Sequence, residues 1–161
     1  MTANLLGSVL LGTTALGCAL NAGVFFAFSS FVMPAFDRLP AEQATSAMQS
    51  INLVVVQSAL MPLLFGTALL ASVAAIGSLR YGYPARALIC AGALVYMAGC
   101  IGVTSLGNVP LNDALAKMAS AEAGAYWPSF SSAWVMWNTV RTAACTGAAI
   151  LFGIAYFGKS I

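Results

Sequence analysis

The sequence has very little charge. Only 6% of its 161 residues are charged and 61% are hydrophobic, whereas about 25% of the residues in a typical soluble domain are charged. The mean hydropathy is +0.92. So few charges would not keep a folded surface hydrated, so we expect the surrounding solvent to be lipid. The net charge of +2 and the lack of a basic run argue against a nucleic-acid partner.

Histidine is absent, which removes the commonest metal ligand and the commonest general base. The sequence also has no C-x-x-C pair. Its four cysteines all lie inside apolar runs: Cys18, Cys90, Cys100 and Cys145. This placement favours buried, small apolar side chains over zinc or redox chemistry. With no metal-ligand set and no phosphate-cradling loop, the sequence predicts neither a metal nor another bound cofactor.

What the sequence does contain is long apolar runs. Four of them approach or exceed the 20 or so residues that cross a bilayer as a helix, at roughly 5–34, 53–79, 85–106 and 131–157. Backbone groups in lipid must be paired, and the runs lack the alternation of barrel strands. The first run has no basic leader and is too long for a signal peptide. We therefore predict an all-α, integral membrane four-helix bundle, with residues 1–161 forming a single domain.

The two ends of the predicted bundle differ. One end carries both termini and the short loop at 80–86, while the other carries the longer segments at 37–52 and 108–130. Pro40 suits the first turn of a helix, so the second helix is expected to run from 40 to 79 and to project from the membrane or bend at Pro62. Residues 112–122 are expected to form a short polar helix. Extended helix ends and this short helix would roof a pocket on one side.

The basic residues give an expected orientation. Arg80, Arg86 and Lys159 lie at the end with the termini, and Arg38 and Lys117 lie at the other end. The positive-inside tendency then places both termini in the cytoplasm. The expected location is the inner membrane of a bacterium.

A polar stripe marks the fourth apolar run. Trp134, Asn138 and Arg141 follow one another at helical spacing, and Trp127 and Ser131 extend the line. A charge within a span usually faces the bundle interior or a water-filled cavity. In the alternative interpretation, the arginine snorkels to lipid phosphate and the tryptophans form an interfacial belt. Asn138 favours the first interpretation, because anchoring needs no amide on this face.

The segment "GNVPLN", residues 107–112, interrupts the end of the third apolar run. It contains three residues that perturb a helix: Asn108, Pro110 and Asn112. One interpretation is a helix stop at Val109 followed by an N-cap at Asn112. In the other, the turn folds over the bundle and lends amides to a pocket floored by Arg141, with Asn52 at the mouth of the second helix. A rigid turn can serve both purposes.

Four stretches together resemble the anthrone oxygenase family of small four-span membrane proteins, which has fungal and bacterial members. They are "GVFFAFSSFVMPAF" at 23–36, "MQSIN" at 48–52, "GNVPLN" at 107–112 and "FSSAWVMWNTVR" at 130–141. The resemblance covers most of the chain. It implies a four-helix membrane bundle in which the NVPLN and W–N–x–x–R segments share a site.

The resemblance also implies a chemistry: oxidation of an activated methylene to a ketone by molecular oxygen, without a bound metal or flavin. The protein would stabilise the anion of an apolar aromatic substrate and supply a base. The expected catalytic residues are Arg141, Asn108, Asn112 and Asp113. The expected substrate-binding residues are Asn52, Trp134, Trp137 and Asn138. Asp113 is the preferred base, with Asp37, Glu122 or water as alternatives, although a first-turn carboxylate also simply suits a helix N-terminus.

Two other functions remain open. The first is a non-catalytic membrane protein that serves as a subunit of a complex or binds lipid or a quinone-like molecule. Its partner would be another membrane protein or, in a homo-oligomer, further copies of the same chain. The second is a small transporter, but proton-coupled transporters usually keep an acid within a span. All four acids here lie at the end opposite the termini: Asp37, Glu42, Asp113 and Glu122. Transport is therefore the least favoured function.

Overall fold

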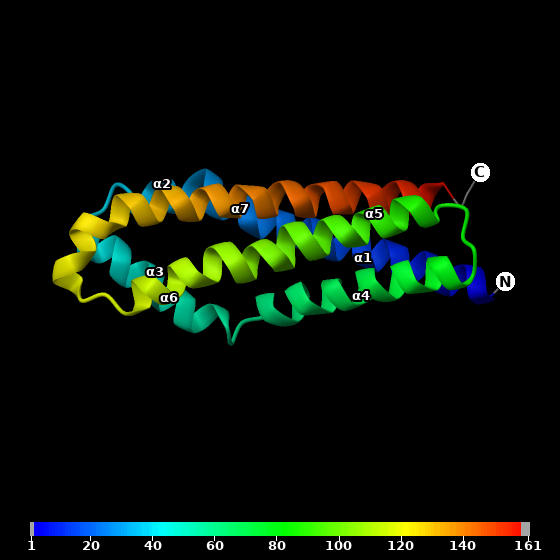
Figure 1. Ribbon diagram of the computed structural model, residues 1–161, viewed down its shortest axis with the longest axis horizontal. Helices are drawn as coiled ribbons and strands as arrows, with labels where there is room; N and C mark the ends of the chain where they lie inside the picture. Colours follow the sequence, from blue (N-terminus) through cyan, green and yellow to red (C-terminus); the bar gives the residue numbers. More distant parts are fainter. Residues whose placement is uncertain (1, 159–161) are drawn as a thin grey trace.

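The computed structural model describes residues 2–158, which form a bundle of long helices (Figure 1). The first helix of the bundle consists of α1 (Thr2–Ala27), the π-helical segment η1 (Phe28–Val32) and α2 (Met33–Phe36). The second consists of α3 (Ala41–Val55) and α4 (Leu60–Arg80). The third consists of α5 (Arg86–Tyr96), the π-helical segments η2 (Met97–Gly102) and η3 (Thr104–Asn108), and α6 (Val109–Ala116). The fourth is α7 (Ser120–Phe157). The described residues contain no strand, so the predicted all-α class is confirmed.

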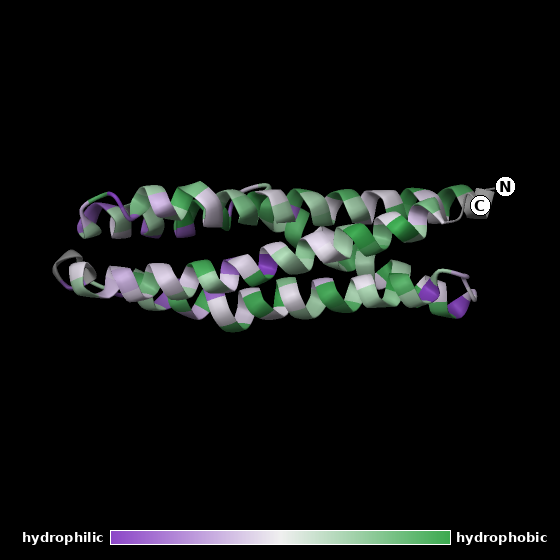
Figure 2. Cartoon of the chain, turned by 90° about the horizontal axis from the view of Figure 1, so that it is seen from above, coloured by the Kyte–Doolittle hydropathy of each residue, from purple (hydrophilic) through white to green (hydrophobic). Residues whose placement is uncertain are grey.

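Four stretches are long and apolar enough to cross a membrane: Leu5–Phe36, Leu60–Arg80, Arg86–Ala116 and Gly124–Phe157. Large apolar side chains point outward along them, among them Leu106, which is 84% exposed. Hydrophobic residues extend along most of the bundle, and hydrophilic residues gather mainly towards its two ends (Figure 2). An outer surface of this kind matches lipid rather than water. The protein is an integral membrane four-helix bundle, as predicted.

At the end of the bundle opposite the termini, the helices extend beyond the length needed to cross a bilayer. α1 begins and α7 ends beside the loop between α4 and α5, while α2, α3, α6 and the first turns of α7 extend at the opposite end (Figure 1). Three of the apolar stretches have 31 to 34 residues, which correspond to roughly 45–50 Å against a hydrocarbon core of about 30 Å. The prediction of extended helix ends on one side is therefore confirmed.

The predicted continuous helix from 40 to 79 with a bend at Pro62 is wrong. The chain leaves the helix after Val55 and resumes at Leu60, so Pro62 lies in the first turn of α4. In an unbroken helix the proline ring would clash with the carbonyl of Ser58, whereas the first helical turn tolerates proline. Ser58 also accepts a hydrogen bond from the backbone N–H of Leu60 at 3.2 Å, which supports the new helix start.

The predicted helix stop at Val109 is also wrong, because the chain stays helical through Pro110. The preceding segment η3 is π-helical, and the N–H of Val109 donates to the carbonyl of Thr104, five residues back. Because this wider turn changes the register of the hydrogen bonds, proline can enter without breaking the helix. The separate polar helix predicted at 112–122 is wrong for the same reason: the helix continues to Ala116, and α7 starts at Ser120.

Small residues bring the third helix close to α7. Gly99 of η2 faces Ala144, and a Cβ atom at position 99 would overlap the Cβ of Ala144. Small side chains allow such close approach of helix backbones in lipid, where packing replaces the hydrophobic effect as the source of stability. This contact fixes the third helix against the helix that carries the polar stripe.

Replacement of Gly99 by alanine is therefore expected to lower the free energy of unfolding by about 1–3 kcal/mol, the usual range for overpacking. Thermal unfolding of the purified protein in detergent, followed by circular dichroism, measures the effect. Gly23→Ala is the matched control, because a Cβ there meets nothing within 4 Å. Equal unfolding midpoints for the two variants would contradict the close contact.

Candidate functional site

Polar and aromatic side chains of α7 form one buried face. Its members follow helical spacing: Trp127, Ser131, Trp134, Asn138 and Arg141. Arg141 is only 7% exposed, although it carries a charge. Trp137 is 37% exposed and lies outside this face. The stripe thus points into the bundle, and Arg141 does not snorkel to the membrane surface.

Hydrogen bonds and aromatic rings hold the Arg141 guanidinium. Its Nη1 donates to Oγ1 of Thr104 at 3.2 Å, and its Nη2 donates to Oδ1 of Asn138 at 2.6 Å. Its Cζ lies 4.1 Å from the centre of the Phe25 ring and 5.6 Å from that of Trp134. Cation–π contacts and charge-assisted hydrogen bonds offset part of the desolvation of the cation.

No carboxylate accompanies this cation in the described part of the chain. Its hydrogen-bond partners are neutral, and its Nε is buried without a partner. A buried charge without a counter-charge is unfavourable, and ionisable groups inside a membrane usually mark functional sites. The bundle interior therefore holds a positive charge that no carboxylate among the described residues neutralises and one N–H group that has no acceptor.

Asn138 connects the arginine to α1. While its Oδ1 accepts from Arg141, its Nδ2 donates to the carbonyl of Phe25 at 2.6 Å and to Oγ of Ser29 at 2.7 Å. Oγ1 of Thr139 lies 3.3 Å from the Ser29 hydroxyl, but its one proton has a closer acceptor in the carbonyl of Val135, at 2.8 Å. Ser29 accepts from Asn138, so its own hydroxyl proton can be donated onward. The result is a hydrogen-bond chain that runs from the guanidinium through an amide to a hydroxyl.

The π-helical segments explain how this chain of bonds is assembled. Where the hydrogen-bond ladder changes from four to five residues, a carbonyl loses its regular partner, and such wide turns often occur at functional sites. The carbonyl of Phe25 lies just before η1 and is the one that Asn138 reaches. Ser29 belongs to η1, and Thr104 and Asn108 belong to η3. The π-helical segments η1, in the first helix, and η3, in the third, therefore both face the polar stripe of α7.

The NVPLN segment contacts the stripe directly. Nδ2 of Asn108 donates to the carbonyl of Trp134 at 3.2 Å, and Nε1 of Trp134 donates to Oδ1 of Asn112 at 2.9 Å. Oδ1 of Asn108 is buried without a partner. The structure thus brings the two motifs together, but through Trp134 rather than through the arginine. Asn112 is not an N-cap, since its side chain holds the indole.

The other predicted site residues lie further out. Asp113 is exposed on α6, away from the buried face. Asn52 is half-buried on α3, and its Nδ2 is buried without a partner. Trp137 packs against Gly107, because a Cβ added there would lie 2.8 Å from the indole. Of these residues, Asn52 is the one with an unused polar group inside the bundle.

A hollow of about 460 Å³ lies beside the polar stripe, between the α1–η1–α2 helix and α7. From the first helix and the residue that follows it, the walls include Ser29 and Asp37. From α7 they include Trp127 and Val135. Nε1 of Trp127 donates to Oδ1 of Asp37 at 2.8 Å, which fixes the carboxylate at the wall. The hollow is therefore lined by Ser29, whose hydroxyl is connected to Arg141 through Asn138, and by the carboxylate of Asp37.

Sequence reasoning did not find all of these residues. Phe25, Ser29 and Thr104 were missed as site residues, and Asp37 ranked only as an alternative base. The signal for Ser29 was present, since Ser29 and Ser30 interrupt an apolar run. No spacing rule indicates which of two adjacent serines faces α7 across a π-helical turn, so the sequence alone did not identify the right one.

Within the described residues, no three histidine, cysteine or carboxylate side chains gather as a metal site. The cysteines are free, and Cys18, Cys100 and Cys145 pack in the apolar core nearer the termini. The groups gathered around Arg141 offer positive charge, N–H and O–H donors, and aromatic surfaces. Such groups suit a flat organic ligand with a negatively charged oxygen.

Fold and site together define a small integral membrane protein with an arginine–asparagine cluster buried inside its helical bundle. The family model described as anthrone oxygenase matches residues 51–151. The chain belongs to the anthrone oxygenase family. No curated protein and no solved structure matches the chain. The matched region contains the NVPLN segment and the stripe of α7, whereas Ser29 and Asp37 precede it.

Proposed function

We propose that this protein oxygenates an apolar, anthrone-like aromatic substrate in the hollow between the α1–η1–α2 helix and α7. The observation that carries this proposal is the hydrogen-bond chain from Arg141 through Asn138 to Ser29, which ends at the wall of the hollow. Through this chain a cation that is itself buried can act on a ligand it does not touch.

The net reaction converts R₂CH₂ and O₂ into R₂C=O and H₂O. A base removes one methylene proton and leaves an electron-rich enolate, which passes one electron to oxygen. The substrate radical and superoxide combine to form a C–O bond, and protonation gives a hydroperoxide. Cleavage of its O–O bond, with loss of the second methylene hydrogen as a proton, releases water and leaves the ketone. Oxygen accepts all four electrons that the carbon loses.

In this proposal, the hydroxyl of Ser29 donates a hydrogen bond to the enolate oxygen and keeps its proton. Successive hydrogen bonds polarise one another in a low-dielectric interior, so the charge of Arg141 strengthens the donor at the far end of the chain. A fixed donor aimed at developing negative charge is usually the largest single contribution to such catalysis. Arg141 and Asn138 are then positioning residues, and Ser29 is the group that touches the substrate.

Asp37 is the base in this arrangement rather than Asp113, because Asp37 lines the hollow and Asp113 does not. Asp37 follows Ser29 by eight residues, so about 12 Å separates their positions along the helix. In an anthrone the carbonyl oxygen and the methylene carbon lie on opposite sides of the central ring. A donor and a base at opposite ends of the hollow therefore match the two atoms on which the reaction depends.

The substrate reaches the hollow from the bilayer. Pro34, Pro128 and Ser132 line it and are exposed near the extended ends of two membrane-spanning helices. An apolar aromatic compound concentrates in lipid and can enter from the side without crossing the water phase. Burial of the polar face strengthens the electrostatic interactions along the hydrogen-bond chain that leads to the enolate.

Oxygen uptake by the purified protein in lipid nanodiscs, with an anthrone as substrate, tests the proposal. Uptake is expected to exceed the buffer rate, with one ketone formed per oxygen consumed. Ser29→Ala is expected to lower kcat by about 100-fold, the effect of losing one oxyanion donor. Ser30→Ala is the matched control, because Ser30 is the adjacent, exposed serine. Wild-type uptake by Ser29→Ala would contradict the role of the hydroxyl, and substrate binding without any uptake would identify a non-catalytic ligand-binding protein.

A further inference from the structure

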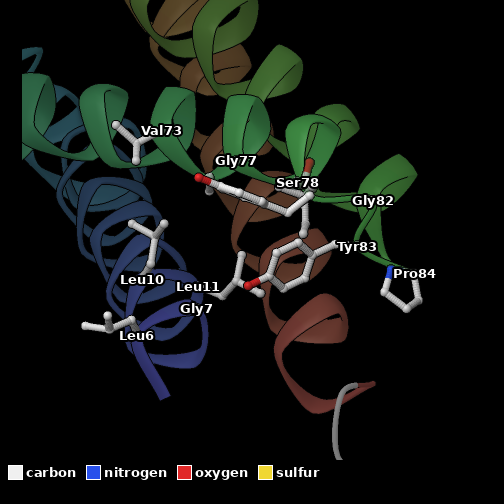
Figure 3. A pocket seen from close by; sticks show the side chains of 13 residues that line it. Leu6, Gly7, Leu10, Leu11, Val73, Gly77, Ser78, Gly82, Tyr83 and Pro84 are labelled. Carbon is white, nitrogen blue, oxygen red and sulfur yellow. The ribbon is translucent and has the colours of Figure 1, made fainter. Parts of the chain in front are cut away.

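A second and larger hollow lies at the opposite end of the bundle, beside the termini. Its volume is about 680 Å³, within the range of about 300–1,000 Å³ that is typical of small-molecule sites. Leu6 and Leu10 of α1 face Val73 and Gly77 of α4, and Tyr83 of the connecting loop closes one side (Figure 3). The lining of this hollow is mainly apolar, and the hollow lies between helices that pass through lipid.

The charge around this hollow has one sign. Arg80 ends α4 and Arg86 begins α5, so both lie within a helical turn of lining residues, and both are exposed. None of the four acidic residues lies at this end of the bundle, because all of them belong to the opposite helix ends and loops. Arginines beside an apolar cavity at the membrane surface match a ligand with an anionic head and an apolar tail.

We infer that this hollow is a binding site for one anionic phospholipid. An acyl chain lies against Leu6, Leu10 and Val73, and the phosphate lies beside Arg80 and Arg86. Tyr83 lies between the two regions, at the depth where tyrosine is enriched in membrane proteins. The site is separate from the polar stripe of α7, and the inference does not depend on the proposed oxygenation.

A substitution at Gly77 can fill the hollow without disturbing the protein core. A Cβ atom at this position meets nothing within 4 Å, so a larger side chain enters empty space rather than the protein core. Gly77→Leu fills the space that the acyl chain would occupy. Gly66→Leu is the matched control on the same helix, because its Cβ also meets nothing within 4 Å and Gly66 does not line the hollow.

Native mass spectrometry of the full chain, titrated in detergent with phosphatidylglycerol or phosphatidylcholine, tests the inference. The wild type and Gly66→Leu are expected to bind one phosphatidylglycerol with roughly 30-fold preference over phosphatidylcholine, because each of two arginines near an anionic headgroup contributes about 1 kcal/mol. Gly77→Leu is expected to lose this bound lipid. The double variant Arg80→Gln/Arg86→Gln is expected to bind both lipids equally, and these exposed side chains can be changed without disturbing the core.

Two results would overturn the inference. One is equal binding of the two lipids by the wild type, which would remove the role of the arginines. The other is retention of the bound phosphatidylglycerol by Gly77→Leu at the level of Gly66→Leu. If Gly77→Leu does not fold, the double arginine variant decides the question alone, because an unchanged preference of roughly 30-fold in it would equally overturn the site.

Discussion

Replacement of Arg141 by glutamine is expected to lower kcat for oxygen uptake by about 100- to 1,000-fold, with a much smaller change in KM. Glutamine keeps N–H donors on the side chain but removes the charge that polarises the bonds to Asn138 and Ser29. The neutral substrate binds largely through its apolar rings, so the loss falls on the enolate. Steady-state oxygen uptake with an anthrone separates the two constants.

If Arg141 had a purely structural role, its replacement would lower stability and leave turnover per folded molecule unchanged. The guanidinium is buried without a carboxylate partner, and removal of such a charge often leaves stability unchanged or raises it. We therefore expect the thermal midpoint of Arg141→Gln to be no lower than that of the wild type. Arg38→Gln, which neutralises an exposed arginine at the same end, is the matched control. Loss of folding in Arg141→Gln together with normal turnover per folded molecule would contradict our account.

Replacement of Asp37 by asparagine is expected to lower kcat by about 10²- to 10⁴-fold, the usual contribution of a positioned base. Asparagine has the same shape and keeps an oxygen that can accept the bond from Nε1 of Trp127. The walls of the hollow should therefore stay in place, and binding of a substrate analogue should be unchanged. Oxygen uptake and analogue binding are measured on the same preparation.

The control for Asp37 is Asp113→Asn, the same chemical change on the exposed carboxylate of α6. This variant is expected to turn over at the wild-type rate. If Asp113→Asn loses activity while Asp37→Asn keeps it, the base has been assigned to the wrong carboxylate.

The fold was predictable because the bilayer imposes strict requirements on a sequence. Long apolar runs with almost no charge must form helices, so four spans and their approximate positions followed directly. The helix breaks were less predictable. Proline at position 62 indicated a bend, but the chain leaves the helix after Val55 and resumes at Leu60, where Ser58 supports the new helix start. Proline at position 110 indicated a stop, but a π-helical turn absorbs it.

The site was predictable only along one helix. Regular α-helical spacing on α7 placed Trp134, Asn138 and Arg141 on a common face, and the structure shows that this face is buried. The partners on the other helices depend on how those helices are rotated. Because η1 and η3 each shift the register by one residue, the faces that carry Ser29 and Thr104 do not follow from a period of 3.6 residues.

The most direct test of the central claim uses a phenol without an oxidisable methylene, such as a naphthol. Its absorbance reports whether it is ionised, so a pH titration of the bound ligand measures how strongly the site stabilises an oxyanion. We expect the bound phenol to ionise at a lower pH than in detergent alone, and we expect Arg141→Gln to abolish this difference. If the bound phenol ionises at the same or a higher pH, the buried arginine does not act on the hollow.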